Sequence, residues 1–301
     1  MELGMIGLGK MGGNMVTRLI QGGHKVVAYD RSPDAVKAAA GQGAVGVNSL
    51  QDLINNLEAP RAVWIMVPSG APTESTVNAL AELMQPGDVI IDGGNSKYTD
   101  DARRAAELSK KNLDYMDVGT SGGIWGLKNG YCLMIGGQKA TFDRLESIFK
   151  TLAPENGYGY MGKIGAGHFV KMVHNGIEYA MMQAYAEGFD LMNASEFKPD
   201  LAQIADLWMQ GSVVRSWLLE LGAEALKHNP KLTGIKPYVN DSGEGRWTVE
   251  AAIDLAVPLP AITAALFARF ASRQDDSFSL KFLNALRNQF GGHEIVQGKP
   301  K

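Results

Sequence analysis

The sequence predicts a doubly wound α/β domain followed by an all-α domain, and three features of its 301 residues support this. In the first half, short apolar runs bounded by Gly, Pro or Asp alternate with helical patterns, which is typical of a doubly wound sheet. After Leu152 the strand-like runs stop and only helical periodicity continues. A glycine-rich motif also lies at the first junction between strand and helix. We expect the domains to cover residues 1–160 and 161–301, with the boundary in a Gly- and Tyr-rich linker that contains at most one short strand.

Each element is predicted from its apolar period. Six β-rich runs are predicted strands of a parallel sheet: Leu3–Ile6, Val26–Tyr29, Ala62–Val67, Val89–Ile91, Tyr115–Val118 and Cys132–Ile135. The helices predicted between them are Met11–Ile20, Ser32–Ala40, Thr73–Met84 and Tyr98–Lys111. The all-α part is predicted to contain His168–Asn193, Pro199–Trp208, Val213–Lys227, Trp247–Ala256, Pro260–Ser272 and Ser277–Phe290. Ser32 is a predicted N-cap, because Pro33 suits the first helical position.

Composition and charge exclude several classes of protein. With 45% hydrophobic and 20% charged residues, the chain can bury two cores and is not of the disordered class. A net charge of −3 and the lack of a dense Lys/Arg tract argue against nucleic acid or a membrane surface as the main partner. The longest uncharged stretch, Leu255–Ala268, is too short and too interrupted by prolines to span a bilayer.

The cysteine count, the spacing of potential metal ligands and the N-terminal pattern bear on the compartment and on metal binding. The single cysteine, Cys132, allows no internal disulfide and no cysteine-rich metal site. No group of His, Asp and Glu has the sequence spacing of metal ligands, so no metal is predicted. Met1–Gly12 lacks the basic-then-apolar pattern of a signal peptide. We therefore expect a cytoplasmic protein.

The motif Gly7–Gly12 (GLGKMG) matches a dinucleotide-binding fingerprint. With 36 glycines, this spacing is expected by chance about 0.5 times per chain, and it recurs at Gly41–Gly46 and Gly157–Gly162. Only the first copy follows an apolar strand, opens a helix and precedes an acid, Asp30, at the end of the next strand. The context therefore predicts a Rossmann-type dinucleotide-binding domain. Asp30 favours NAD over NADP, whereas Arg31 could pair with a 2′-phosphate or stack on adenine.

A polar stripe follows one face of the long helix predicted after Gly165. Its members recur at i, i+3, i+4, i+7 and i+8, namely Lys171, His174, Asn175, Glu178 and Tyr179. A desolvated Lys can act as a base near neutral pH, and a nearby Glu can serve as an acid. A solvated face with a Lys–Glu pair is the alternative, but such faces seldom combine five different polar side chains.

Two glycine turns point to the same part of the fold. Asp92–Ser96 and Gly119–Gly123 each follow a predicted strand, and ligands bind at the carboxyl ends of parallel strands. Asn95 and Ser121 add donors suited to a carboxylate or phosphate. Ordinary tight turns are the alternative. In the second half, Arg246, Arg269, Arg287 and His293 are candidates for anion binding, although a single Arg on a helix is more often a surface residue.

Together these motifs resemble the 6-phosphogluconate dehydrogenase family in its short form. The resemblance rests on Gly7–Gly12, Asp92–Ser96, Ser121–Gly123, His168–Glu178 (HFVKMVHNGIE) and Arg287–His293 (RNQFGGH). It covers essentially the whole chain. It implies an NAD-binding domain, an all-helical substrate-binding and dimerisation domain, and oxidative decarboxylation of 6-phosphogluconate to ribulose 5-phosphate and CO2 with reduction of NAD.

The resemblance also implies the role of each matching residue, with Lys171 as general base and Glu178 as general acid. The implied cofactor residues are Gly7, Leu8, Gly9, Lys10, Met11, Gly12, Asp30, Arg31, Val67, Pro68 and Asn95. The implied substrate residues are Asn95, Ser121, Gly122, Gly123, His174, Asn175, Tyr179, Arg246, Arg269, Arg287 and His293. Arg287 and His293 would reach in from the second subunit of a homodimer, with a tetramer as the alternative assembly.

The chain departs from the family's pattern in three places. Asp30–Ser32 (DRS) is found where larger NADP enzymes read Asn-Arg-Thr, which makes NADP the less expected cofactor. Arg246 replaces a lysine of the phosphate site, and Ile124 and Trp125 follow Ser-Gly-Gly where charged residues are common. Two alternative functions remain: a dehydrogenase of a non-phosphorylated 3-hydroxyacid, and a non-catalytic dinucleotide-binding sensor.

Overall fold

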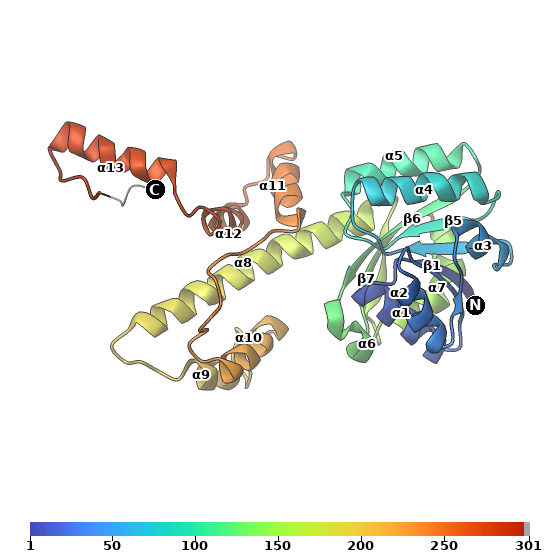
Figure 1. Cartoon of the computed structure of the whole chain (residues 1–301), viewed down its shortest axis with the longest axis horizontal. Coiled ribbons are helices and arrows are strands. Elements are labelled where there is room, and N and C mark those ends of the chain that lie inside the picture. Colours follow the sequence, from blue (N-terminus) through green and yellow to red (C-terminus); the bar gives the residue numbers. More distant parts are fainter. Residues whose placement is uncertain (298–301) are drawn as a thin grey trace. The chain divides into compact units, whose positions relative to one another are not determined.

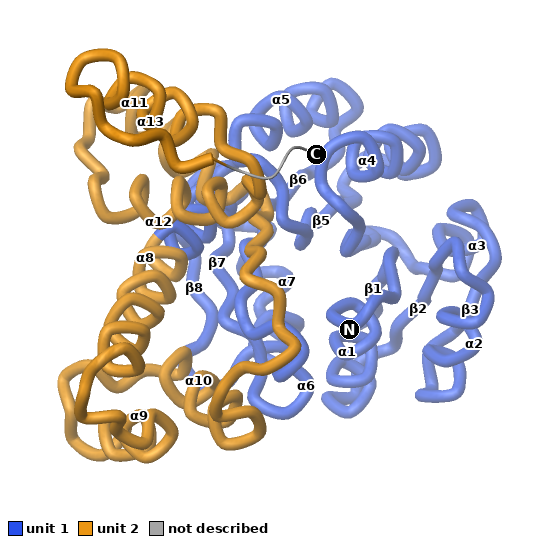
Figure 2. Tube along the Cα trace, turned by 60° about the vertical axis from the view of Figure 1, so that its left-hand side comes forward, with its two compact units in different colours: residues 1–176 blue, residues 177–301 orange. Residues whose placement is uncertain are grey.

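The computed structural model describes residues 1–297, which form two compact units (Figures 1 and 2). The first covers residues 1–176 and the second begins at Ile177, within a long helix, α8 (Ala166–Ala194). Over residues 1–297, every helix is too short or too polar to cross a bilayer.

The first unit is an eight-stranded sheet with the order β3-β2-β1-β4-β5-β6-β7-β8. Its strands are β1 (Glu2–Ile6), β2 (Lys25–Tyr29), β3 (Val45–Gly46), β4 (Ala62–Ile65), β5 (Val89–Asp92), β6 (Asp114–Ser121), β7 (Cys132–Gly136) and β8 (Tyr158–Gly162). The first six strands are parallel. β7 runs antiparallel to β6 and parallel to β8, so the prediction that Cys132–Ile135 joins a wholly parallel sheet is wrong. A short hairpin-like connection between β6 and β7 leaves no room for a crossover helix of the βαβ kind.

Helices cover both faces of this sheet (Figure 1). One face packs against α1 (Lys10–Gln21), α2 (Pro33–Gly41) and α7 (Lys139–Leu152), and the other against α3 (Leu50–Asn55), α4 (Ala71–Leu83) and α5 (Tyr98–Ser109). A 3-10 turn (Gly123–Trp125) and the short α6 (Gly126–Asn129) join β6 to β7. Ser32 caps α2 as predicted, because its hydroxyl accepts a hydrogen bond from the Ala35 N–H.

The first turns of α8 lie directly on the sheet. A Cβ at Gly167 would overlap the carbonyl oxygens of Asp117 and Met134, so only glycine allows this approach. The carboxylate of Asp117 accepts hydrogen bonds from the backbone N–H groups of Gly165 and His168, at 2.8 and 2.9 Å. A carboxylate at a helix N-terminus also offsets the helix dipole. These contacts group residues up to 176 with the sheet, whereas the boundary predicted at residue 160 falls within β8.

The second unit is helical, as predicted. After α8 it contains α9 (Leu201–Trp208), α10 (Trp217–His228), α11 (Glu244–Asp254), α12 (Pro260–Ala271) and α13 (Phe278–Gly291). Tyr179 packs with Ala265 and Leu266 in one small core, and α9 and α10 share another. Helix α13 contributes no buried side chain. The α/β unit followed by a helical unit confirms the predicted fold class.

Candidate active site

The glycine motif forms a tight turn into α1 in which two of its glycines are sterically required. Gly7 has φ +91°, and a Cβ there would overlap the carbonyl oxygen of Met66. A Cβ at Gly12 would overlap the carbonyl oxygen of Gly7. Gly9, by contrast, faces open space at the N-terminus of α1. The turn therefore exposes backbone at a helix N-terminus, where a pyrophosphate can approach closely.

Asp30 fastens this turn to the end of β2. Its carboxylate accepts hydrogen bonds from the Leu8 N–H at 2.7 Å and the Ser32 N–H at 2.8 Å. A carboxylate can accept about four hydrogen bonds, so lone pairs remain for ribose hydroxyls. Arg31 is exposed beside it. The geometry thus supports binding of a dinucleotide, with its pyrophosphate at the glycine turn and its ribose hydroxyls hydrogen-bonded to Asp30.

The loops after β4 and β5 border the same edge of the sheet. After β4, the carbonyl of Pro68 accepts a hydrogen bond from the Thr73 hydroxyl at 2.9 Å, which fixes the turn that contains Val67. At the end of β5, Asp92 is buried and accepts hydrogen bonds from the Gly94 N–H and the Ser96 hydroxyl. The buried Asp92 carboxylate therefore fixes the conformation of this loop. Asn95 is partly exposed and remains available for a ligand.

The second predicted turn is shorter than expected. Gly119–Ser121 belong to β6 and pair with β7, so only Gly122 and Gly123 form the turn, with φ of +135° and +52°. The longer strand places Ser121 at its very end, with its hydroxyl 3.4 Å from Nε2 of His174. Strand β6 thus meets the polar stripe of α8 directly.

The part of the stripe that lies in the first unit forms a connected polar cluster. The Asn175 carboxamide oxygen accepts hydrogen bonds from the Lys171 ammonium and from Nδ1 of His174, the latter at 2.9 Å. Lys171 is only 8% exposed although it carries an ammonium group. Lys171, His174, Asn175 and Ser121 are therefore brought together as predicted, with a buried amine next to strand β6.

A buried charged network lies at the start of α8. His168 Nδ1 is 2.8 Å from Asp101, and Asp92 and Asp101 both accept from the Tyr115 hydroxyl at 3.1 Å. Arg104, which is 2% exposed, lies 3.3 Å from Asp92. Burial raises the pKa of Asp101 to about 6. For His168, burial alone would lower the pKa, but the neighbouring carboxylates outweigh it and raise the pKa to about 10.

Three residues of this network lie close enough together to be candidate metal ligands. Ligand atoms of Asp92, Asp101 and His168 lie within 4.8 Å of one another, although the three are far apart in sequence, where spacing predicted no such group. The guanidinium of Arg104 and the hydroxyl of Tyr115 already compensate the carboxylates. We therefore regard the network as the support of α8.

A cationic cluster in the second unit contains three of the predicted phosphate residues. The Arg269 guanidinium carbon lies 3.5 Å from the ring centroid of Tyr179, whose hydroxyl is 3.2 Å from the Ser242 hydroxyl. Arg246 donates to the Asp241 carboxylate from Nε at 2.9 Å and from Nη2 at 3.1 Å. Hydrogen bonds from Arg246 lower the pKa of Asp241 to about 2.

Two further residues predicted for the phosphate site, through a second subunit, lie apart from this cluster within the chain. Arg287 on α13 and His293 beyond it are exposed and, within the described part of the chain, form no hydrogen bond or ring contact with Arg246, Arg269 or Tyr179. Sequence reasoning missed Asp241, Ser242 and Arg273 from the cluster. A signal was present for Arg273, because it follows Arg269 by four residues, just after α12 ends at Ala271.

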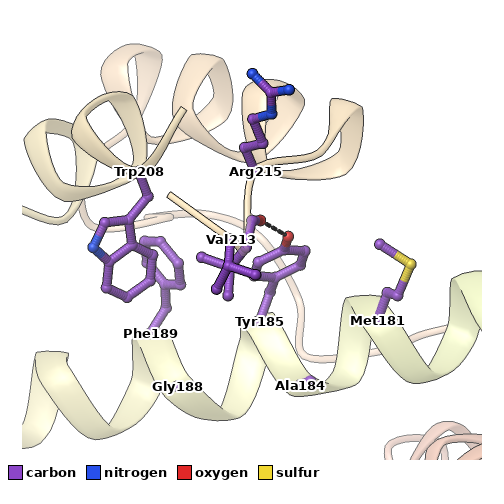
Figure 3. A pocket seen from close by; sticks show the side chains of 9 residues that line it. Met181, Ala184, Tyr185, Gly188, Phe189, Trp208, Val213 and Arg215 are labelled. Carbon is purple, nitrogen blue, oxygen red and sulfur yellow. Dashed lines mark hydrogen bonds between the residues drawn. The ribbon is translucent and has the colours of Figure 1, made fainter. Parts of the chain in front are cut away.

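A separate pocket of about 370 Å³ lies farther along α8 (Figure 3). It is lined by Met181, Ala184, Tyr185, Gly188, Phe189, Trp208, Val213, Val214 and Arg215. The Tyr185 hydroxyl donates to the Val214 carbonyl, and the Arg215 side chain points away from the apolar side chains (Figure 3). This lining is mostly apolar, so we assign it no part in acid–base chemistry.

The fold, the polar cluster around Lys171 and the cationic cluster of the second unit are those of a dinucleotide-dependent dehydrogenase. Residues 2–165 match the family model described as the NAD binding domain of 6-phosphogluconate dehydrogenase, and residues 167–295 match its C-terminal domain. The chain belongs to the 6-phosphogluconate dehydrogenase family, which confirms the resemblance noted in the sequence.

Individual relatives agree with this assignment. A Haloferax volcanii protein, named 6-phosphogluconate dehydrogenase, NAD(+)-dependent, decarboxylating, is 44% identical over 299 residues, or 99% of each chain. The structure of Plasmodium falciparum 6-phosphogluconate dehydrogenase is 30% identical, with a TM-score of 0.82, and the match covers 100% of this chain and 67% of that one. The 3-hydroxyisobutyrate dehydrogenase of Salmonella typhimurium shares the fold alone, at 23% identity, a TM-score of 0.77 and coverage of 91% and 95%.

Proposed function

We propose that this protein catalyses the oxidative decarboxylation of 6-phosphogluconate to ribulose 5-phosphate and CO2 with NAD as the oxidant. The observation that carries the proposal is the buried Lys171, whose ammonium donates to Asn175 next to His174 and Ser121. Membership of the family and the name of the H. volcanii relative supply the substrate class and the cofactor.

The open backbone at Gly9 and the carboxylate of Asp30 fit a dinucleotide, which would be held by Gly7–Gly12, Val67, Pro68 and Asn95. When bound, NAD supplies the acceptor for the hydride that leaves C3 of the substrate. Asp30 would repel the 2′-phosphate of NADP, so NAD is the proposed cofactor and NADP the poorer one.

In the proposed mechanism Lys171, in its neutral form, removes the proton of the C3 hydroxyl as C3 is oxidised to a ketone. The new carbonyl can accept an electron pair, so the C1–C2 bond breaks and the carboxylate leaves as CO2. Lys171 returns its proton to the C3 oxygen, which gives an enediol. Glu178, seven residues after Lys171 and therefore on the same face of α8, protonates the carbon that lost the carboxylate.

The remaining residues are proposed to hold the substrate. Asn95, Ser121, Gly122, Gly123, His174 and Asn175 are assigned to the sugar acid, and Tyr179, Arg246 and Arg269 to its phosphate. The cationic cluster is the feature that favours a phosphorylated substrate over a small 3-hydroxyacid, because arginines bind phosphate through parallel hydrogen bonds. The buried Lys171 and its partners favour an enzyme over a non-catalytic sensor.

We further propose that the protein works as a homodimer in the cytoplasm. Phe278, Phe282 and Phe290 of α13 are 79%, 54% and 80% exposed, and apolar surface of this kind is usually covered by a partner. In a dimer, Arg287 and His293 would complete the partner's phosphate site. Light scattering tests the assembly, and a tetramer is the alternative outcome.

The function is tested by absorbance of reduced nicotinamide with 6-phosphogluconate, run in parallel with NAD and with NADP. We expect faster turnover with NAD. Lys171→Met should lower kcat by roughly 10²–10⁴-fold, the usual contribution of a general base, while Lys163→Met, a change at an exposed lysine before α8, should not. Near-normal turnover of a folded Lys171→Met protein, or equal activity on gluconate, would overturn the proposal.

A further inference from the structure

The segment Val239–Ser242 is tied to the end of α12 by a series of hydrogen bonds. The Val239 N–H donates to the Ser272 hydroxyl at 3.0 Å, and Arg269 Nη1 donates to the Asn240 carbonyl at 2.8 Å. Asp241, the residue after Asn240, accepts a hydrogen bond on its carboxylate from Arg273 Nη1 at 2.9 Å. Asp241 is therefore held by Arg273, just beyond α12, in addition to the Gly243 N–H of its own loop, which donates to it at 3.2 Å.

Asp241 lies between two guanidinium groups. Its side chain is 5% exposed, against 49% for Arg246 and 22% for Arg273. Arg246 occupies one oxygen through Nε and the other through Nη2, and Arg273 binds the second oxygen as well. Both guanidinium groups also lie near the Phe270 ring, with their central carbons 4.4 and 5.2 Å from its centroid. Arg246 is thus held by its Nε edge while its Nη1 group is not bound to Asp241.

This arrangement has a consequence for charge. Alone, Asp241 would neutralise Arg246 and repel a phosphate that approached it. Arg273 compensates Asp241, so that Arg246 and Arg269 together leave two net positive charges among the four groups. Glu250, which also acts on Arg246, is exposed and therefore screened by solvent. Two positive charges match the two negative charges of a phosphate monoester near neutral pH.

We propose that Arg273 is a specificity-determining residue, which takes up the Asp241 carboxylate so that Arg246 is both oriented and left with its charge for the substrate phosphate. This rests on the proposed function, in which Arg246 and Arg269 bind that phosphate. Arg273 acts through Asp241 and touches no reacting atom. It therefore sets the preference for a phosphorylated over a non-phosphorylated sugar acid rather than the rate of chemistry.

The test compares Arg273→Gln, Arg273→Lys and the double change Asp241→Asn/Arg273→Gln with the wild type. In Arg273→Gln, KM for 6-phosphogluconate should rise by about ten-fold, because an uncompensated carboxylate now faces the phosphate, while kcat stays within about two-fold. Arg273→Lys, which keeps the charge, should recover most of the affinity. The double change removes one positive and one negative charge together, so it should also recover part of the affinity for 6-phosphogluconate. Arg215→Gln, a change at an exposed arginine outside the cluster, is the matched control.

Calorimetric binding of 6-phosphogluconate without cofactor gives a second readout, and thermal unfolding verifies that each variant is folded. Unchanged KM and binding in Arg273→Gln would overturn the proposal, as would equal losses in Arg273→Lys and in the double variant, which would indicate a merely structural contact. Failure of the wild type to turn over 6-phosphogluconate would instead refute the proposed function. The two failures are therefore distinguishable.

Discussion

The backbone of Gly119 in β6 lies directly against the side chain of Lys171 in α8, and a Cβ at position 119 would overlap the Cβ of Lys171. The same Cβ would lie 2.8 Å from the carbonyl oxygen of Gly167. The missing side chain therefore lets the helix approach the sheet and sets the position of the proposed base. A glycine that sequence reasoning assigned to a ligand-binding turn thus serves helix packing.

Gly119→Ala should consequently impair catalysis without touching the substrate. The added methyl group must displace α8, and a displacement of about 1 Å at a reacting group can cost on the order of 100-fold in rate. Overpacking should also lower the free energy of unfolding by about 1–3 kcal/mol. Steady-state kinetics and urea unfolding measure both effects.

Gly188→Ala, in the same helix, is the matched control. A Cβ there meets nothing within 4 Å, so kcat should be unchanged and stability should rise by about 0.5–1 kcal/mol from the loss of backbone freedom in the unfolded chain. A folded Gly119→Ala protein with wild-type kcat would contradict the role assigned to Gly119.

The glycines of the cofactor turn should respond differently to the same substitution. Gly12→Ala forces a clash with the Gly7 carbonyl and should lower the unfolding temperature as well as activity. Gly9→Ala meets open space and should leave the unfolding temperature unchanged, but it should raise KM for NAD by about ten-fold, because the pyrophosphate needs the backbone exposed. Equal effects of the two changes on stability, or an unchanged KM for NAD in Gly9→Ala, would count against the proposed cofactor position.

Most of the sheet could be predicted because buried strands are short apolar runs between turn residues. The antiparallel β7 could not, since direction depends on the connection rather than on the strand's own residues. Strand β3 has only two residues, too few for a period. Helix α7 was not among the predicted helices, although Phe142, Leu145 and Phe149 show its spacing in the sequence.

The site was predictable where it follows local spacing. Lys171, His174 and Asn175 share one helix, so periodicity alone placed them together. The network of Asp101 and His168 joins α5 to α8, and Asp241 pairs with Arg273 across 32 residues. Neither contact can be predicted from the spacing of residues within one segment. Burial of these charges depends on tertiary packing, which a single sequence does not display.

Asp30→Asn should shift the cofactor preference toward NADP. The change removes the charge that would repel a 2′-phosphate and loses one of the two hydrogen bonds from Leu8 and Ser32. We expect the ratio of kcat/KM for NAD to that for NADP to fall by about ten-fold or more, because placing like charges together in a binding site is costly. Adding Arg31→Ala should remove the gain with NADP if Arg31 pairs with the phosphate. An unchanged ratio in Asp30→Asn would show that the carboxylate does not read the ribose.

The His168–Asp101 pair should make part of the protein's stability depend on pH. Neighbouring carboxylates raise the pKa of His168 in the folded protein to about 10, above the usual 6.5, although burial opposes this. The folded state therefore binds this proton more tightly than the unfolded state does, and its contribution to stability is complete below pH 6.5. That contribution is lost as the pH rises through about 10. The difference in unfolding free energy between the wild type and His168→Gln should thus shrink from pH 6 to pH 10.

Urea unfolding at several pH values measures this difference, and subtraction cancels the lysines and tyrosines that both proteins share. His228→Gln, at an exposed histidine of α10, is the matched control and should change the unfolding free energy little. Asp101→Asn should reduce the pH dependence as His168→Gln does, because the ionised carboxylate is the nearest group that stabilises the imidazolium. A wild-type advantage over His168→Gln that stays constant from pH 6 to pH 10 would mean that His168 is buried in its neutral form.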